Sequence, residues 1–179
     1  KKEIFRRYNS GIVPLKKFDI ERASYISDEL TQIFTLEINK NKRLYKFLRD
    51  TILPSSKRKC NQRDAINILV GIIRSLITLP YIPIATYARA TSKADIINKS
   101  YQNITEDNST EENIKIVSSF KRKVRLIKGL YQELNDGKID ANNLFFEVNF
   151  WALSVLEQEK HTITSKELKK IAEAYRIVD

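Results

Sequence analysis

Glycine, proline, cysteine, histidine and methionine are all scarce in this 179-residue sequence: it has four Gly, four Pro, one Cys, one His and no Met. Few glycines and prolines disfavour a β fold with many turns and favour long helices. The single cysteine, Cys60, excludes an internal disulfide and a cysteine-rich zinc site, and it fits a reducing cytoplasm. No apolar run approaches the roughly 18 residues of a membrane span. We therefore expect a cytoplasmic protein without a membrane partner.

The motifs of common catalytic centres are also missing. His161 is the only histidine, so a His-Cys metal cluster or a two-histidine nuclease centre is excluded within this chain. Neither glycine-rich phosphate-binding loop, Gly-x-x-x-x-Gly-Lys-Ser/Thr or Gly-x-Gly-x-x-Gly, is present. Cys60 follows a basic run at 57–59, but a thiol without a positioned histidine is a weak nucleophile. The sequence thus predicts no catalytic residue, no metal site and no cofactor held by this chain alone.

Apolar residues recur at helical spacing along nearly the whole chain, which predicts an all-α fold, a single irregular multi-helix bundle. Residues 61–79 and 117–134 carry the clearest patterns, the first broad and the second a single stripe. The core is predicted to include Ile66, Leu69, Ile73, Val124, Ile127 and Trp151.

Three further local features bear on the helices. Asn61 is placed to cap the helix over 61–79, and Ser109/Glu112 and Thr164/Glu167 have the spacing of capping boxes. Between 143 and 158 a bulky face is expected to point inward. Its members are Leu144, Phe145, Val148, Trp151, Ala152, Val155 and Leu156.

The formal net charge of +10 is concentrated in the first part of the chain. Residues 1–104 hold 20 Lys or Arg against 9 Asp or Glu, whereas residues 105–179 hold 12 against 13. Such a bias suits a polyanionic partner, because each phosphate contact releases counterions. DNA is therefore a candidate partner. A solvated, lysine-rich surface with no nucleic-acid partner is the open alternative.

Two short basic runs are the candidate nucleic-acid contacts. The first is Lys57, Arg58 and Lys59, in a segment expected to be a loop. The second lies on the flanks of the helix over 117–134 and consists of Lys121, Arg122, Lys123 and Arg125, with Lys128 beyond it. This second run is read either as a solvated flank of a packed helix or as a rail for phosphates.

Near the N-terminus, Phe5, Arg7, Asn9, Gly11 and Leu15 follow the spacing Phe-x-Arg-x-Asn-x-Gly-x-x-x-Leu, with Asp19 four residues further on. Read locally, this is the end of a helix followed by a turn, because Asn and Gly tolerate positive φ. The same spacing resembles the segment that closes the ParB-like domain of GmrSD-type proteins. Those proteins are nucleotide-dependent nucleases that defend bacteria and archaea against foreign DNA.

The resemblance implies that residues 1–16 end a ParB-like domain and that residues 17–179 form a helical domain. It assigns nucleotide binding to Arg7, as the cation for a phosphate, and to Asn9 and the backbone near Gly11. The chain departs from the family pattern at Ile12, where a second glycine is usual, and at Glu21, where an arginine is usual. The first departure weakens the backbone anion site, and the second removes a phosphate contact.

In the family an Asp-Gly-Gln-Gln-Arg motif precedes the signature, and these 179 residues lack it. Together with the absence of methionine, this favours a fragment of a larger α/β plus α protein. The missing ParB-like domain, a nuclease domain or subunit, and a nucleoside triphosphate bound by the full-length protein are the implied partners. The alternative is a non-enzymatic helical module that binds nucleic acid or protein.

Overall fold

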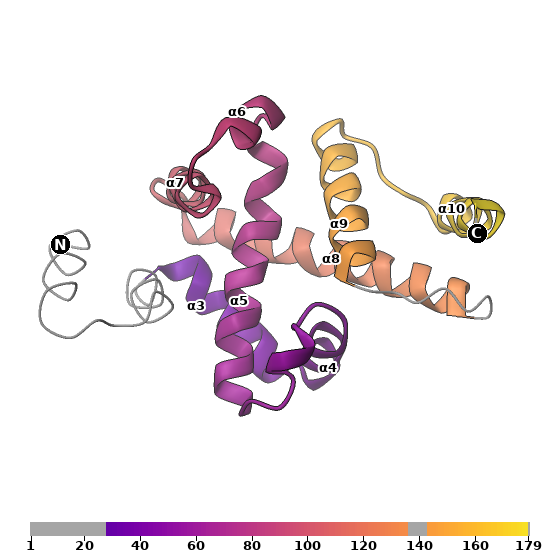
Figure 1. Ribbon diagram of the computed structural model, residues 1–179, viewed down its shortest axis with the longest axis horizontal. Coiled ribbons are helices and arrows are strands. Elements are labelled where there is room, and N and C mark those ends of the chain that lie inside the picture. Colours follow the sequence, from indigo (N-terminus) through magenta and orange to yellow (C-terminus); the bar gives the residue numbers. More distant parts are fainter. Residues whose placement is uncertain (1–27, 136–142, 179) are drawn as a thin grey trace, which may run out of the picture.

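Helices form all the regular secondary structure in the part of the chain that the computed structural model describes, residues 28–135 and 143–178 (Figure 1). The prediction of an all-α bundle is confirmed there. The α-helices are α3 (Glu29–Lys40), α4 (Lys42–Thr51), α5 (Gln62–Thr78), α6 (Ile84–Arg89), α7 (Lys93–Thr105), α8 (Thr110–Asn135), α9 (Asn143–Gln158) and α10 (Ser165–Val178). Two short 3-10 helices, η1 (Ser55–Lys57) and η2 (Leu79–Tyr81), flank α5.

Helix α5 runs through the centre and crosses the long helix α8, with α3, α4, α7 and α9 around them (Figure 1). Asn61 caps α5 as predicted, because its Oδ1 accepts a hydrogen bond from the backbone N–H of Asp64 at 2.9 Å. The predicted core residues of α5 and α8 are confirmed. Ile66, Leu69, Ile73, Val124 and Ile127 are all buried in one cluster.

One described segment, Gln62–Tyr81, is long and apolar enough to cross a membrane, judged by length and composition alone. An 18-residue stretch within it has a mean hydropathy of 1.3, and 44% of that stretch is buried inside the protein. A core helix meets the same criterion, and α5 contacts α3, α4, α7 and α9. We therefore read this segment as the central core helix. The expectation that no apolar run approaches the length of a membrane span holds only for uninterrupted runs. Arg63, Asp64 and Arg74 interrupt this segment.

A line of contacting aromatic rings joins five helices. Phe34 of α3 meets Phe120 of α8 edge to face, with ring centroids 5.3 Å apart. From Phe120 the contacts continue through α9 and α4 and end on α10; the remaining rings are Phe150, Phe146, Phe47, Tyr131, Phe145 and Tyr175. Edge-to-face and tilted pairs of this kind add to the stabilisation that burial provides.

The prediction that Trp151 lies in the core is wrong. Trp151 is 45% exposed, and Leu144 and Val148 on the same face of α9 are 66% and 50% exposed. The inward face instead carries Phe146 and Phe150, which are fully buried. Because α9 is apolar around most of its circumference, its spacing cannot reveal which side packs.

Helix α10 packs on the C-terminal half of α8 and forms a second, smaller cluster. Its buried members are Leu130, Leu134 and Ala172, with Leu168, Ile171 and Tyr175 packed against them. Gly129 permits the close approach: a Cβ at that position would lie 3.1 Å from Leu168 Cδ2.

Both predicted capping boxes are present. The Ser109 hydroxyl accepts from the Glu112 N–H at 3.3 Å, and the Glu112 carboxylate accepts from the Ser109 N–H at 2.7 Å. Thr164 and Glu167 make the same reciprocal pair at 3.3 and 2.8 Å. The backbone N–H of Ser109 holds the pKa of Glu112 below its ordinary value of 4.5, and the N–H of Thr164 does the same for Glu167.

We expect the protein to lose stability as the pH falls below about 4.5, and a Glu112→Gln/Glu167→Gln variant to lose less. A carboxyl whose pKa is lowered on folding stabilises the protein above its unfolded-state pKa, and this contribution disappears as the pH falls through its folded-state pKa. Glutamine keeps the acceptor oxygen but does not titrate. Urea denaturation midpoints from about pH 7 to about pH 3 measure the effect. Equal acid sensitivity in the variant and the parent would contradict it.

Candidate functional site

The predicted nucleotide-binding residues, Arg7, Asn9 and Gly11, lie outside the described residues, as does the expected domain over 1–16. Nucleotide binding by them stays a prediction. The predicted nucleic-acid contacts, by contrast, all lie within described helices or loops.

The basic run on α8 is largely paired with carboxylates. Lys121 Nζ lies 2.6 Å from Glu37 on α3, and Arg122 Nη2 lies 2.6 Å from Glu157 on α9. Lys123 Nζ lies 2.5 Å from the other oxygen of Glu157. Arg125 is exposed and makes no ion pair within the described residues. Three of the four cations are therefore paired, but they share two carboxylates, so about half of the positive charge of this run is offset within the described residues.

Lys123 is 7% exposed, so it is a core residue rather than part of a solvated flank. Its ammonium also donates to the Ser119 hydroxyl at 3.1 Å and sits 5.3 Å from the centre of the Phe150 ring. Ser119 in turn donates to the Glu157 carboxylate at 2.7 Å. An ammonium held in this way has no free electron pair, so it cannot act as a general base for Ser119.

Ser119, Lys123 and Glu157 line a hollow of about 590 Å³ between η2, α7, α8 and α9. Partial burial opposes ionisation of Glu157, but hydrogen bonds from Lys123 and Ser119 outweigh it and hold the pKa of Glu157 below its ordinary range. The hollow thus contains an ion pair that is already satisfied. We read it as part of the packing of α9 on α8.

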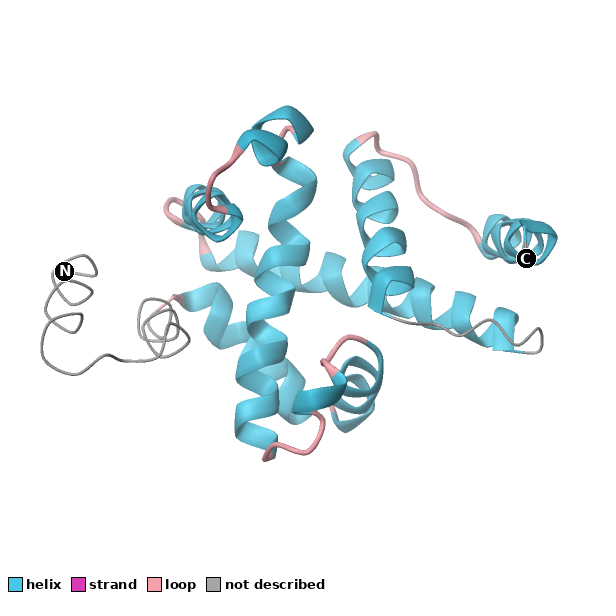
Figure 2. Cartoon of the chain, in the orientation of Figure 1, coloured by secondary structure: helices cyan, strands magenta, loops and turns pink. Residues whose placement is uncertain are grey.

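The other basic run, Lys57 to Lys59, lies in the loop that joins α4 to α5 (Figure 2). Arg58 fastens this loop to α4, because its guanidinium donates to the backbone carbonyls of Asp50 at 2.8 Å and Leu53 at 3.3 Å. Lys57 and Lys59 are exposed. Arg58 therefore holds the loop in place, while its two neighbours are free to face a partner.

Further exposed cations lie next to this loop. Lys40 ends α3, and Lys42, Arg43 and Lys46 lie on the outer face of α4, opposite the inward-facing Leu48. The Gln62 to Asn39 hydrogen bond at 3.4 Å brings the start of α5 to the end of α3. We call the six exposed residues the basic end; they are Lys40, Lys42, Arg43, Lys46, Lys57 and Lys59.

Charge in this region is strongly one-sided. Residues 40–59 contain eight Lys or Arg residues and one carboxylate, Asp50. None of the six basic-end residues forms an ion pair within the described part of the chain. Sequence reasoning found Lys57 and Lys59 but missed the four cations from Lys40 to Lys46, although their place on the polar side of an amphipathic pattern was a usable signal.

The first turn of α4 holds cations where helices favour acids. Asn41 caps the helix through its Oδ1, and Lys42 and Arg43 follow with no acidic residue in that turn. Helices α3, α5, α7, α8 and α10 all have an acid in the first turn. A cation at this position opposes the helix dipole by about 0.3–1 kcal/mol. Lys42 and Arg43 therefore do not serve the stability of α4.

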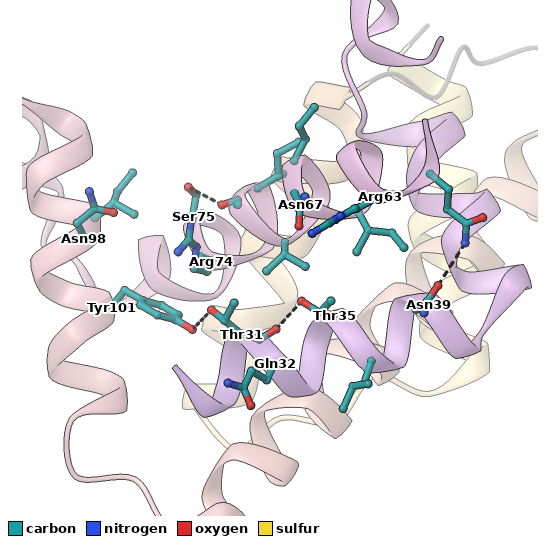
Figure 3. Close-up of a pocket in the computed structure, with 18 of the residues that line it drawn as sticks. Thr31, Gln32, Thr35, Asn39, Arg63, Asn67, Arg74, Ser75, Asn98 and Tyr101 are labelled. Carbon is teal, nitrogen blue, oxygen red and sulfur yellow. Dashed lines mark hydrogen bonds between the residues drawn. The ribbon is translucent and has the colours of Figure 1, made fainter. Parts of the chain in front are cut away.

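A second and larger hollow, about 940 Å³, lies along α5 between α3 and α7 (Figure 3). Tyr101 lies at one end, where its hydroxyl donates to Asp28 at 2.6 Å and also meets the Thr31 hydroxyl at 3.1 Å. Burial, and then the hydrogen bond to Asp28, raise the pKa of Tyr101 well above its ordinary value. Tyr101 is thus a neutral hydrogen-bond donor that holds α7 to the start of α3.

Metal ligands do not gather anywhere in the described residues: no group of three or more His, Cys, Asp or Glu side chains is placed to hold a metal ion. His161 is half exposed and pairs with Glu167 at 3.3 Å. Cys60 is partly buried against the core. The basic end and the hollow along α5 are therefore the two candidate sites.

Comparison of the chain with protein-family models, with curated proteins and with solved structures gave no match.

Proposed function

We propose that this chain is the helical part of a GmrSD-type, nucleotide-dependent DNA-targeting defence protein, and that its basic end holds the phosphate backbone of DNA. The observation that carries the DNA contact is the basic end itself, six exposed cations from three neighbouring segments with no carboxylate paired to them in the described residues. Charge of one sign on an outer surface attracts polyanions and releases counterions when they bind.

The helix dipole gives independent support. Lys42 and Arg43 carry an unfavourable interaction with the start of α4 when the protein is free. A phosphate bound beside them lowers the local positive charge, so the disadvantage is reduced in the complex. Cations retained at a cost to the free helix are typical of a site that functions when an anion is present.

The mode of binding follows from the side chains available. The basic end consists of lysines and one arginine on the outside of a short helix and a loop. Such groups contact phosphate oxygens and carry little sequence information, whereas base recognition requires side chains inserted into a groove. We therefore propose binding to duplex DNA that is independent of sequence and strongly dependent on salt.

Replacing Lys42, Arg43 and Lys46 together with glutamine is expected to weaken DNA binding about tenfold or more at low salt. The slope of log affinity against log salt should also fall by about 2 to 3, because each lost phosphate contact removes about 0.9. Fluorescence anisotropy of a labelled duplex, titrated at several salt concentrations, measures both quantities.

The matched control removes three charges elsewhere. Lys166, Lys169 and Lys170 are exposed on α10, far along the chain from the basic end (Figure 1). Their replacement with glutamine should change the affinity much less. Equal losses in the two triple variants would show a response to net charge alone and would overturn the assignment of the basic end.

Membership of the GmrSD-type family is tested separately, at the gene. An Asp-Gly-Gln-Gln-Arg motif encoded upstream in the same reading frame supports it. Its absence from the full reading frame favours the second candidate, a non-enzymatic helical module. In that module the basic end would also contact the phosphate backbone of DNA. Nucleotide binding through Arg7, Asn9 and Gly11 belongs to the first candidate only.

A further inference from the structure

The hollow along α5 is shaped as a groove between helices. It is lined on α5 from Gln62 to Ser75, a distance of about 20 Å at 1.5 Å per residue. Helix α3 forms one wall, and α7 closes the end near Tyr101 (Figure 3). A groove of this length, flanked by helices, matches three to four turns of an added helix.

The lining combines an apolar floor with hydrogen-bond donors and excess positive charge. Its apolar residues include Leu36, Ile66, Ile68, Val70, Ile72 and Ile97. Arg63 and Arg74 also line it, and none of the lining residues that the structure describes carries a carboxylate. Leu36 is 53% exposed on the rim. An occupant with an apolar face and a negative charge complements this surface.

Asn67 gives the most specific indication. Its side-chain nitrogen is buried at the groove and has no hydrogen-bond partner in the described structure. Leaving a buried donor unpaired costs about 1–3 kcal/mol, so an acceptor supplied by an occupant would be favourable. Arg63 lies one turn before Asn67 on the same face of α5 (Figure 3).

Gly71 lies one turn after Asn67 on α5. Because glycine has no side chain, the groove is deeper at this position. A Cβ at this position would meet only the Arg74 guanidinium, at an ordinary 3.8 Å. The glycine is therefore not required by packing within the described residues, although it costs about 1 kcal/mol relative to alanine inside a helix. An occupant that lies close to α5 at this point would explain why the residue is a glycine.

We propose that this groove binds an amphipathic helix of a partner protein that has an apolar face and flanking carboxylates. The apolar face packs on Leu36 and Ile72, which are not fully buried, a carboxylate pairs with Arg63, and an oxygen of the partner accepts from Asn67. The inference does not depend on DNA binding, since it concerns a different surface.

The probe is a fluorescein-labelled synthetic peptide of about 14 residues, three to four helical turns, with leucines at i, i+3, i+4 and i+7 and glutamates on the flanks. We expect saturable binding to the whole 179-residue chain by anisotropy. The same peptide with lysine in place of glutamate should bind at least about tenfold more weakly, because the described lining of the groove carries arginines and no carboxylate. Equal affinity for the two peptides, or no binding of the acidic one, would overturn the proposal.

Gly71→Leu places a side chain in the groove and should weaken peptide binding at least about tenfold. Ser118→Leu, on an exposed position of α8 outside the groove, adds the same side chain as a control and should leave binding unchanged. The side-chain amide resonance of Asn67 should shift when the acidic peptide is added. Binding that survives Gly71→Leu, or an unmoved Asn67 resonance, would place the peptide elsewhere and overturn the proposal.

One further outcome identifies another occupant. If Gly71→Leu converts a dimer of the chain to a monomer in analytical ultracentrifugation, the groove binds a second copy and the partner proposal fails. DNA affinity measured on the same Gly71→Leu protein should equal that of the parent. A failure of the groove proposal is thereby separated from a failure of the proposal that the basic end binds DNA.

Discussion

Phe150→Ala is expected to lower the free energy of unfolding by about 3–5 kcal/mol, the range for removing a fully buried aromatic ring. Phe150 has no exposed surface and contacts the rings of Phe120 and Phe146. Its removal leaves a cavity between α8 and α9 and interrupts the line of aromatic contacts. It also takes away the ring beside the buried Lys123 ammonium.

Trp151 is the matched control, because it is the next residue and also a large aromatic one. It is 45% exposed, so Trp151→Ala should cost under about 1 kcal/mol. Urea denaturation followed by circular dichroism measures both changes. A larger loss for Trp151 than for Phe150 would show that α9 packs through the face that its sequence favoured.

Glu157→Ala is expected to destabilise the protein by about 2–3 kcal/mol, because it leaves the buried Lys123 ammonium without its carboxylate. The figure is below the usual 3–5 kcal/mol for breaking a buried pair, since the Glu157 side chain is 32% exposed. Glu37→Ala breaks the more exposed pair with Lys121 and should cost under about 1 kcal/mol.

The double variant Lys123→Met/Glu157→Leu tests whether the loss of stability in Glu157→Ala comes from the unpaired Lys123 ammonium. Removing both charges together should restore most of the stability, because no buried charge then lacks a partner. The comparison uses the same urea denaturation for the two single variants and the double variant. A double variant as unstable as Glu157→Ala would show that the loss comes from packing rather than from the isolated ammonium.

The sequence was sufficient to predict features that depend on residues close together in the chain. Asn61, Ser109 and Thr164 cap their helices through bonds that span three residues, so their spacing alone identified them. The inner faces of α5 and α8 were also predictable, because each has an apolar side and a more polar one. The residues of the basic end lie close together in the sequence, and their positive charge was visible there.

The ion pairs between different helices were not predictable from local sequence. Lys121 meets Glu37 84 residues away, and Arg122 meets Glu157 35 residues away. A run that reads as a free basic rail therefore has three of its four cations paired with carboxylates in the fold. The groove along α5 likewise depends on where α3 and α7 pack, which no single helix specifies.

The sequence by itself determined the helices, their caps and the two most regular core faces, because backbone hydrogen bonds and apolar spacing act within a few residues. Only the tertiary structure decided which side of α9 is buried, since that helix is apolar on most sides and its neighbours select the face that holds Phe150 and Glu157. It also decided which cations remain available to a partner. Pairing of a charge depends on which carboxylates the fold brings within reach, and those lie on other helices.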